Sequence, residues 1–335
     1  MKLISLYTNL DHVGGAHNLC VSLHFGLMNT GYFSSGMLSS FTPYENIAPK
    51  YRKKITPDAY FSLKLAKVLK DADEVVVISH HRRLTTQLIG LSKIYSKSIK
   101  LIHIAHITLH KYRRFTLFPE NTVAVSQKVK SNIENYFQAR CKRVIYNGIP
   151  NKPASQKTFD PRHIVVSMPA IIESRKQQVV LARFLKNKLP EGMSLQFVGD
   201  GPNKKLLEEE VGNDPQFTLL GHVDDMEKIY RKSDFVLLFS KTEGLPLSLI
   251  EAQNYGIPII CNDVGGSLEI LSPGKNGFLA NSLSELLDCL QSLPKMTTAN
   301  YREMKVASLK NFKEQFQFDK MVNAYLELIK ELCQN

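Results

Sequence analysis

The stretch Glu243-Gly-Leu-Pro-Leu-Ser-Leu-Ile-Glu251 joins two patterns that alternate along the whole chain. The apolar run Phe235–Phe239 precedes it and has the length of a buried strand, while Leu247–Tyr255 is predicted to be a helix. This helix is expected to close at Gly256, a residue suited to the left-handed cap position, before a strand over Pro258–Cys261. A strand, a helix and a second strand in this order predict a parallel α/β sheet.

The two glutamates of this stretch occupy different positions. Glu243 falls in the strand-to-helix loop, whereas Glu251 falls inside the helix. The start of a helix offers free backbone N–H groups and a partial positive charge, which favour a phosphate. Carboxylates instead accept hydrogen bonds from hydroxyls such as those of a sugar or ribose. A bound nucleotide sugar would use both kinds of group.

Composition indicates a soluble globular protein with room for two domains, since the chain has 335 residues, 43% hydrophobic and 22% charged. No apolar run approaches the ~18 residues of a membrane span, and the first residues predict a strand rather than a signal peptide. The five cysteines are scattered and form no C-x-x-C, so neither a zinc site nor a disulfide framework is indicated. We therefore expect a cytoplasmic location.

The positive charge of the chain lies entirely in its first half. Residues 1–150 hold 21 Lys and Arg against 8 Asp and Glu, whereas residues 151–335 hold 22 against 23. The clusters Arg52-Lys-Lys54, Arg82-Arg83 and Lys111-Tyr-Arg-Arg114 indicate either a solvated basic surface or an anionic partner. Nucleic acid is the least favoured partner because no nucleic-acid module accompanies the charge. A lipid-linked or phosphorylated acceptor at the inner face of the membrane fits better.

The chain divides into two α/β series. The first begins with a strand at Lys2–Tyr7 and a helix at Ala16–Thr30, and the second begins with a strand at His163–Met168. Residues 149–162 between them contain three prolines and little periodicity, as a linker does. Two doubly wound domains joined here would have a ligand site at the carboxyl ends of their strands.

Four further positions stand where a ligand site is expected, after predicted strands. They are Gly15 in Gly14-Gly-Ala16, the pair Arg175-Lys176, Asp200 in Gly199-Asp-Gly-Pro202, and His106. A tight structural turn, a charged helix start, an ordinary turn and a structural histidine are the respective alternatives. His80, His81 and His103 follow or end strands in the same way.

One acidic pair resembles a metal-binding motif but is expected to lie elsewhere. Asp71-Ala-Asp73 precedes a strand, which places it at the amino end of the sheet, away from the ligand site. We therefore interpret it as a solvated helix end and expect no metal ion and no cofactor.

Taken in order, the motifs resemble those of the family-4 glycosyltransferases, which are retaining enzymes of the glycosyl transferases group 1 with the GT-B fold. The strongest match runs from Leu220 to Leu271. Its motifs are Gly221-His-Val223, Asp234, Glu243-Gly-Leu-Pro-Leu-Ser248, Glu251-Ala252, Gly256-Ile-Pro258 and Gly265-Gly266. Weaker matches are Gly14-Gly-Ala16, Ser126, Asn147-Gly148 and Gly199-Asp-Gly-Pro202. Each motif is weak by itself, but the ordered set is specific and covers nearly the whole chain.

The resemblance implies that the two domains bind different substrates. Residues 1–150, completed by a C-terminal helix over residues 316–335, would bind the acceptor, and residues 156–315 would bind the donor. The implied catalytic residues are Glu243, which accepts hydrogen bonds from the donor sugar, Lys176, which stabilises the departing diphosphate, and the cleft histidine His106.

The resemblance also implies a donor-binding set. Gly15 would pass near the diphosphate, Val223 would contact the base through its backbone, and Glu251 would bind the ribose. The complete set is Gly15, Arg175, Lys176, Asp200, Val223, Glu243, Gly244, Leu245, Pro246, Leu247, Ser248 and Glu251.

The chain departs from the family pattern at one position. The family has Gly-Arg at the end of the first strand of the second domain, followed by a Lys, whereas this strand ends Val166-Ser-Met-Pro169. Lys176 matches the later Lys, and Arg175 is the candidate for the missing cation.

These observations predict an enzyme that transfers a sugar from a nucleotide-diphosphate sugar to the hydroxyl of a saccharide or lipid-linked acceptor. Polysaccharide, lipopolysaccharide or glycolipid synthesis is the expected context. The alternatives are a GT-B nucleotide-sugar epimerase, a sugar phosphorylase, and a non-catalytic nucleotide-sugar-binding protein.

Overall fold

The computed structural model describes residues 1–11, 14–55, 60–62, 75–94, 99–109 and 113–334. These residues form two compact units, Met1–Gly148 with Phe318–Asn335, and Ile149–Gln317. We call them unit 1 and unit 2. The expected division fell between residues 150 and 156 and at residue 316. The pair Asp71-Ala-Asp73 and the basic residue Lys111 lie outside the described residues.

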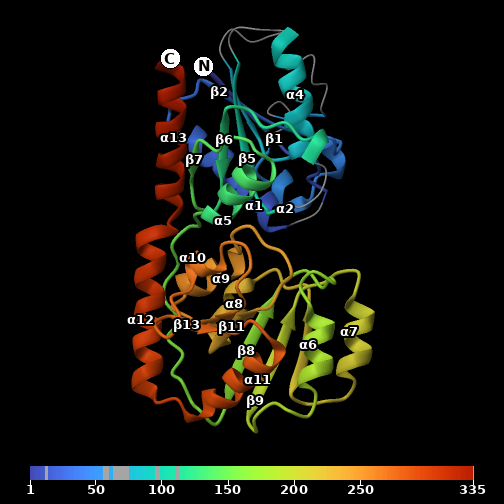
Figure 1. Ribbon diagram of the computed structural model, residues 1–335, viewed down its shortest axis with the longest axis vertical. Helices are drawn as coiled ribbons and strands as arrows, with labels where there is room; N and C mark the ends of the chain where they lie inside the picture. The colour runs from blue at the N-terminus through green and yellow to red at the C-terminus, as the bar shows by residue number, and fades with distance from the viewer. Residues whose placement is uncertain (12–13, 56–59, 63–74, 95–98, 110–112, 335) are drawn as a thin grey trace. The chain divides into compact units, whose positions relative to one another are not determined.

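The described part of unit 1 is a seven-stranded parallel sheet with the order β3-β2-β1-β4-β5-β6-β7 (Figure 1). Its strands are β1 (Lys2–Leu6), β2 (Ser35–Ser40), β3 (Tyr60–Ser62), β4 (Val75–Ser79), β5 (Ile99–Ala105), β6 (Asn121–Ala124) and β7 (Arg143–Val144). Its longer helices are α1 (Gly15–Met28), α4 (Arg82–Ile94) and α13 (Phe318–Gln334), and its shorter ones are α2 (Pro49–Arg52) and α5 (Gln127–Ser131).

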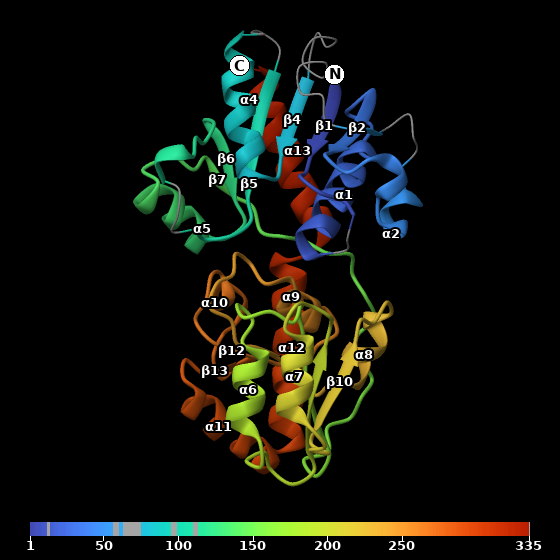
Figure 2. The same ribbon diagram turned by 90° about the vertical axis from the view of Figure 1, so that its right-hand side faces the viewer.

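Helix α13 belongs to unit 1 although it ends the chain, and it packs against α1 (Figure 2). Its apolar face, which includes Val322 and Leu328, is buried. Gly26 of α1 permits the contact, because a Cβ at this position would lie 2.7 Å from the side chains of Phe318 and Val322. Leu19, Leu23 and Leu27, which recur at every fourth position of α1, are buried.

The described part of unit 2 is a six-stranded parallel sheet with the order β10-β9-β8-β11-β12-β13. Its strands are β8 (Ile164–Pro169), β9 (Met193–Val198), β10 (Phe217–Gly221), β11 (Phe235–Leu238), β12 (Ile259–Cys261) and β13 (Gly277–Leu279). Its helices are α6 (Gln178–Leu185), α7 (Lys204–Val211), α8 (Met226–Lys232), α9 (Leu247–Asn254), α10 (Ser267–Ile270), α11 (Leu283–Ser292) and α12 (Thr298–Gln315).

Both sheets reverse their winding direction at one point. The first strand of each unit lies beside its fourth, which means β1 beside β4 and β8 beside β11. In each unit, the loops that follow these two neighbouring strands diverge to opposite faces of the sheet. They leave room for a ligand at the carboxyl edge of that sheet. In unit 2 the core beneath this edge contains Val166, Phe197, Phe235 and Leu237.

The elements predicted from the sequence agree with the structure except in detail. Helix α5 ends at Ser131, and the chain continues as a π-helical turn over Asn132–Tyr136. The sequence patterns did not reveal β2 or the 18-residue helix α12. None of the helices among the described residues is both long and apolar enough to cross a membrane.

Candidate active site

Glu243 lies in the loop that connects β11 to α9, at the point where the winding of unit 2 reverses, and its side chain is buried. Two features shape this loop. Asn262 exchanges hydrogen bonds with Ser240, accepting from its backbone N at 3.0 Å and donating to its carbonyl at 2.8 Å. Gly265 has φ +54°, and a Cβ there would lie 2.5 Å from the carbonyl oxygen of Glu243. The absence of a side chain at Gly265 therefore allows the loop after β12 to lie against the loop that carries Glu243.

Two cations from the neighbouring loop after β8 meet this carboxylate. Lys176 Nζ lies 2.5 Å from Glu243 Oε1, and Arg175 Nη1 lies 3.5 Å from Glu243 Oε2. The Lys176 side chain is only 13% exposed, so the pair is largely removed from water. Removing one partner of such a pair leaves a charge poorly compensated. The sequence placed the sugar-binding carboxylate and the phosphate-binding cation at separate points, but the structure brings them into direct contact.

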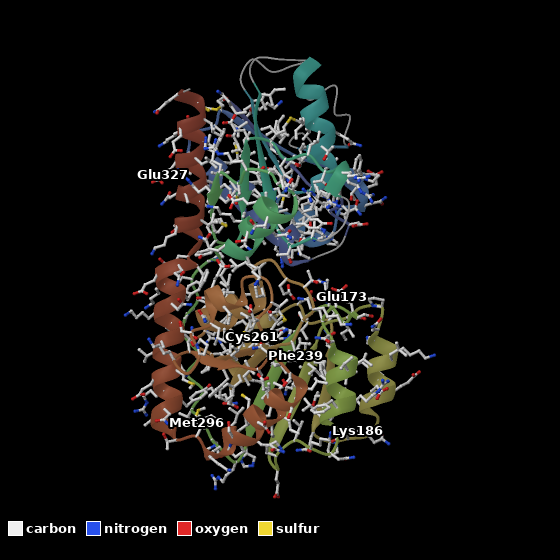
Figure 3. The ribbon with its side chains drawn as sticks, in the orientation of Figure 1. Glu173, Lys186, Phe239, Cys261, Met296 and Glu327 are labelled. Atoms are coloured by element: carbon white, nitrogen blue, oxygen red, sulfur yellow. The ribbon has the colours of Figure 1, made fainter. Side chains whose placement is uncertain are left out.

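Arg175 is held by more than Glu243. Its guanidinium donates to Glu173 Oε1 at 2.6 and 3.1 Å and to the carbonyl oxygen of Thr242 at 2.8 Å. Figure 3 labels Glu173 at the end of unit 2 opposite Lys186 and Met296. Arg175 thus ties the loop after β8 to the loop after β11. The side-chain ammonium of Lys176, in contrast, has Glu243 as its one hydrogen-bond partner among the described residues, so its remaining N–H donors are available to an anion.

The start of helix α9 is suited to an anion. Its N-cap Pro246 makes no side-chain cap hydrogen bond, and no acidic residue lies in the first turn. The N–H groups of a first helical turn have no partner within the helix and carry a partial positive charge. The segment Gly244–Ser248, implicated by the sequence in sugar and diphosphate binding, includes this helix start.

Glu251 lies in the same helix, where Tyr230 Oη of α8 donates to its Oε2 at 2.5 Å. Tyr230 is buried and its ring lies parallel to that of Tyr255, with ring centroids 5.3 Å apart. Burial and the adjacent Glu251 carboxylate raise the pKa of Tyr230 well above its usual value. The phenol is therefore a permanent hydrogen-bond donor that orients Glu251.

Asp200 and Val223 follow β9 and β10, on the other side of β8 from Glu243. Asp200 Oδ1 accepts the N–H of Gly201 at 2.8 Å, and this bond, together with Lys204, lowers the pKa of the carboxyl. The side chain is exposed. Val223 is half-buried next to His222. Both residues lie at the carboxyl edge of the sheet, as expected from their positions after strands.

In unit 1 the candidates Gly15 and His106 also lie at the carboxyl edge of the sheet. Gly15 is the exposed first residue of α1, and Gly14 is its N-cap in extended conformation. His106 follows β5, is half-buried, and its Nε2 lies 3.0 Å from Nδ1 of His80, which follows β4. Burial, with a smaller contribution from His17, lowers the pKa of His106 to about 4.

Three further residues hold the candidates in place. Glu173 binds Arg175, Tyr230 binds Glu251, and His80 binds His106. The sequence had singled out His80, which directly follows a strand, but neither Glu173 nor Tyr230. The described residues contain no group of three or more His, Cys, Asp or Glu side chains that could hold a metal ion.

Comparison with known proteins bears on the enzyme class of this chain. Residues 162–295, which contain Arg175, Lys176, Glu243 and Glu251, match the family model described as glycosyl transferases group 1. The chain is 26% identical over 294 residues to the amylovoran biosynthesis glycosyltransferase AmsD of Erwinia amylovora, with 78% of this chain and 81% of AmsD covered. The chain is a glycosyltransferase. This confirms the enzyme class expected from the sequence.

Two further comparisons concern a part of the chain and the fold. The O-antigen biosynthesis glycosyltransferase WbnH of Escherichia coli is 30% identical over 188 residues, which cover 55% of this chain and 52% of WbnH. The structure of HepE from Anabaena in complex with UDP superposes with a TM-score of 0.81 at 17% identity and covers 99% of this chain and 100% of HepE. The glycosyltransferase therefore has the GT-B fold, as its sequence predicted.

Proposed function

We propose that this glycosyltransferase is a retaining, family-4 enzyme that transfers a hexose from a UDP-sugar to a hydroxyl of a saccharide or lipid-linked acceptor. Polysaccharide, lipopolysaccharide or other glycolipid synthesis is the proposed context, in keeping with the names of AmsD and WbnH. The observation that carries the proposal is the Lys176–Glu243–Arg175 cluster beside the start of α9. It combines a hydroxyl-binding carboxylate with an anion site, as a nucleotide sugar requires.

In this proposal unit 2 binds the donor. Glu243 accepts hydrogen bonds from hydroxyls of the sugar, and the backbone of Gly244–Ser248 holds the sugar and diphosphate. Glu251, oriented by Tyr230, binds the ribose, and Val223 contacts the base through its backbone. Asp200 lines the same edge of the sheet. Unit 1 binds the acceptor, with Gly15 close to the diphosphate and His106 supporting the sugar or the acceptor.

The reaction needs stabilisation of negative charge on the leaving diphosphate. Lys176, Arg175 and the start of α9 supply positive charge without a metal ion. The bond between the anomeric carbon and the diphosphate oxygen breaks, the acceptor oxygen forms the new bond on the same face, and its proton passes to the departing phosphate oxygen. Lys176 releases part of its contact with Glu243 as the diphosphate and the sugar hydroxyls become the partners of the two groups.

The experiment is an assay of the full chain against a panel of nucleotide sugars, with and without candidate acceptors and with EDTA present. Glu243→Ala should lower transfer at least about a hundredfold, the order found on removing one essential transition-state contact. Glu210→Ala is the matched control, because it removes the carboxylate of an ion pair with Arg183 on the exposed side of α7. Near-normal transfer by Glu243→Ala would overturn the assignment.

The products also separate the alternatives. A retaining enzyme gives a product with the same anomeric configuration as the donor sugar. NMR of the donor and the product measures this configuration. An epimerase would instead convert the nucleotide sugar without an acceptor, and a phosphorylase would depend on free phosphate. Binding of a nucleotide sugar with neither transfer nor hydrolysis would indicate a non-catalytic binding protein.

We also propose that unit 1 carries the enzyme to the inner face of the cytoplasmic membrane. Basic side chains on and after α2, Lys50, Arg52, Lys53 and Lys54, are exposed. Phe41, 50% exposed, precedes this helix in the chain and adds an apolar group. Cationic and apolar groups together favour an anionic lipid surface, where a lipid-linked acceptor would reside.

A further inference from the structure

His80 and His106 form a hydrogen-bonded pair at the carboxyl edge of the unit 1 sheet. They follow the neighbouring strands β4 and β5, so their backbones emerge side by side. The Nδ1 of His80 and the Nε2 of His106 are 3.0 Å apart, while the ring centroids are 5.2 Å apart and the planes differ by only 16°. Parallel rings with these two distances must lie edge to edge. The hydrogen bond therefore lies nearly in the plane of both rings and has good geometry.

Each ring of this pair carries a single proton. Burial lowers the pKa of His80 well below its usual value, and the pKa of His106 falls to about 4 for the same reason. A neutral imidazole has one N–H donor and one acceptor nitrogen. One of the two facing nitrogens must donate, so two arrangements are possible, and they differ in whether the outward Nδ1 of His106 carries a proton.

The second nitrogen of His80 decides between them. Its Nε2 is buried and has no hydrogen-bond partner within the described part of the chain. A buried N–H without an acceptor is rarer and costlier than a buried acceptor without a donor. The His80 proton is therefore better placed on Nδ1, where it is bonded to His106, than on the solitary Nε2.

We propose that His80 is a positioning residue that donates its Nδ1–H to Nε2 of His106 and holds His106 in the tautomer with its proton on Nδ1. His106 then presents an N–H donor rather than a base. Its Nδ1 makes no hydrogen bond to the described residues and is suited to an oxygen atom of a substrate, either a sugar hydroxyl or a phosphate. That last step rests on the proposed function, whereas the tautomer itself does not.

The surrounding residues keep His80 in place without competing for the shared proton. Tyr7, which follows β1, packs near the His80 ring with centroids 6.2 Å apart. His103 instead contacts Thr85, whose hydroxyl lies 2.8 Å from its Nδ1. Burial lowers the pKa of His103 as well, to about 3, so it adds no charge to the pair.

The direct test is NMR of the full chain labelled with ¹⁵N-histidine, in which two-bond ¹H–¹⁵N correlations distinguish the two tautomers. His106→Gln and His80→Leu assign the two spin systems by loss of signals. Protonated Nδ1 on both rings is the expected result. A protonated Nε2 on either ring would overturn the proposal, and this measurement needs no substrate.

The kinetic test compares two substitutions of His80. His80→Leu, which removes the donor, should lower kcat/KM about tenfold, the effect of one lost hydrogen bond, and should leave His106 in a mixture of tautomers. His80→Asn places an amide N–H near the position of Nδ1 and should restore most of the activity. Unchanged activity and an unchanged tautomer in His80→Leu would contradict the positioning role.

Failure of the proposed function gives a different pattern. In that case the wild-type chain transfers no sugar from any nucleotide sugar, yet the two Nδ1–H signals are present. His24→Asn is the matched structural control. His24 is another buried histidine of unit 1, bonded to Ser5 rather than to His106, and its substitution should leave the His106 tautomer unchanged.

Discussion

At the level of single residues, the proposed donor site depends on how each carboxylate is oriented. Glu243 is fixed by two cations and Glu251 by one phenol. An oriented acceptor loses less conformational freedom when a ligand binds, because the side chain is already in the bound conformation. The residues that orient the carboxylates are therefore worth testing alongside the carboxylates themselves.

Tyr230→Phe removes only the hydroxyl that donates to Glu251 at 2.5 Å. We expect a several-fold increase in KM for the nucleotide sugar with little change in kcat, and a loss of about 1 kcal/mol in stability, as for one hydrogen bond. The measurements are steady-state kinetics and urea unfolding. Tyr301→Phe is the control, since Tyr301 donates to the backbone of Asp234, and there KM should be unchanged. An unaltered KM in Tyr230→Phe would indicate that Glu251 does not bind the ribose.

At the scale of elements, the loop between β11 and α9 is shaped by a second loop after β12. Gly266 N donates to the carbonyl of Gly244 at 2.6 Å, and the missing side chain of Gly265 makes room for Glu243. The conformation of the loop that carries Glu243 is thus determined by a segment some twenty positions later in the chain.

Gly265→Ala and Gly274→Ala form a matched pair that tests this dependence. Both glycines have positive φ, at +54° and +75°, so both substitutions cost about 1 kcal/mol of backbone strain. Only at Gly265 does the new Cβ meet backbone, at 2.5 Å from the Glu243 oxygen, whereas nothing lies within 4 Å at Gly274. Gly265→Ala should therefore lose transfer activity and further stability, while Gly274→Ala retains its activity. Equal activities would show that the loop does not need this contact.

At the scale of the whole molecule, the histidines are unevenly distributed. Those described in unit 2, His163 and His222, are exposed, whereas unit 1 buries several. Burial lowers the pKa of His24 to about 4 and that of His103 to about 3, from an ordinary value of 6.5. Below pH 6.5 the unfolded chain binds protons that the folded unit excludes, so the stability of unit 1 falls as the pH drops toward 4.

We expect unit 1 to lose on the order of 2 kcal/mol per buried histidine between pH 7 and pH 5, and unit 2 to change much less. Hydrogen exchange, corrected for the intrinsic rate, measures the protection of the backbone amides of β1 and β4. The amides of β8 provide the comparison in the same sample. His24→Asn should reduce the loss in unit 1, because Asn keeps an acceptor for Ser5 without a titrating group. Equal protection of unit 1 at both pH values would contradict the prediction.

The membrane proposal also belongs to this scale, because it concerns the charge of a whole unit. Reversing Lys50, Lys53 and Lys54 to Glu should weaken binding to anionic vesicles about a hundredfold or more, at about 1 kcal/mol for each cation near the surface. Lys205, Lys275 and Lys295 of unit 2 are equally exposed and provide the control reversal. Sedimentation with vesicles at two salt concentrations measures both. Equal binding by the two triple variants would exclude α2 as the contact.

Local sequence was sufficient for most of the fold. Apolar runs such as Phe235–Leu238 predicted strands because a strand buried on both faces needs apolar side chains throughout. Local sequence did not predict strand β2, because its first residues, Ser35-Gly36, lack the β-branched side chains typical of strands. It also failed for α12, which is mostly exposed and buries few side chains, among them Tyr301 and Phe312.

Local sequence patterns predicted the two α/β series and the positions of the candidate residues after strands, and they singled out Glu243 and Glu251. These features depend on periodicity and on residue type, which are local. Which side chains contact one another depends instead on how the chain folds. The tertiary structure pairs Lys176 with Glu243, Tyr230 with Glu251 and His80 with His106. Each pair joins loops or helices brought together by strand order, and neither strand order nor side-chain geometry is encoded in local spacing.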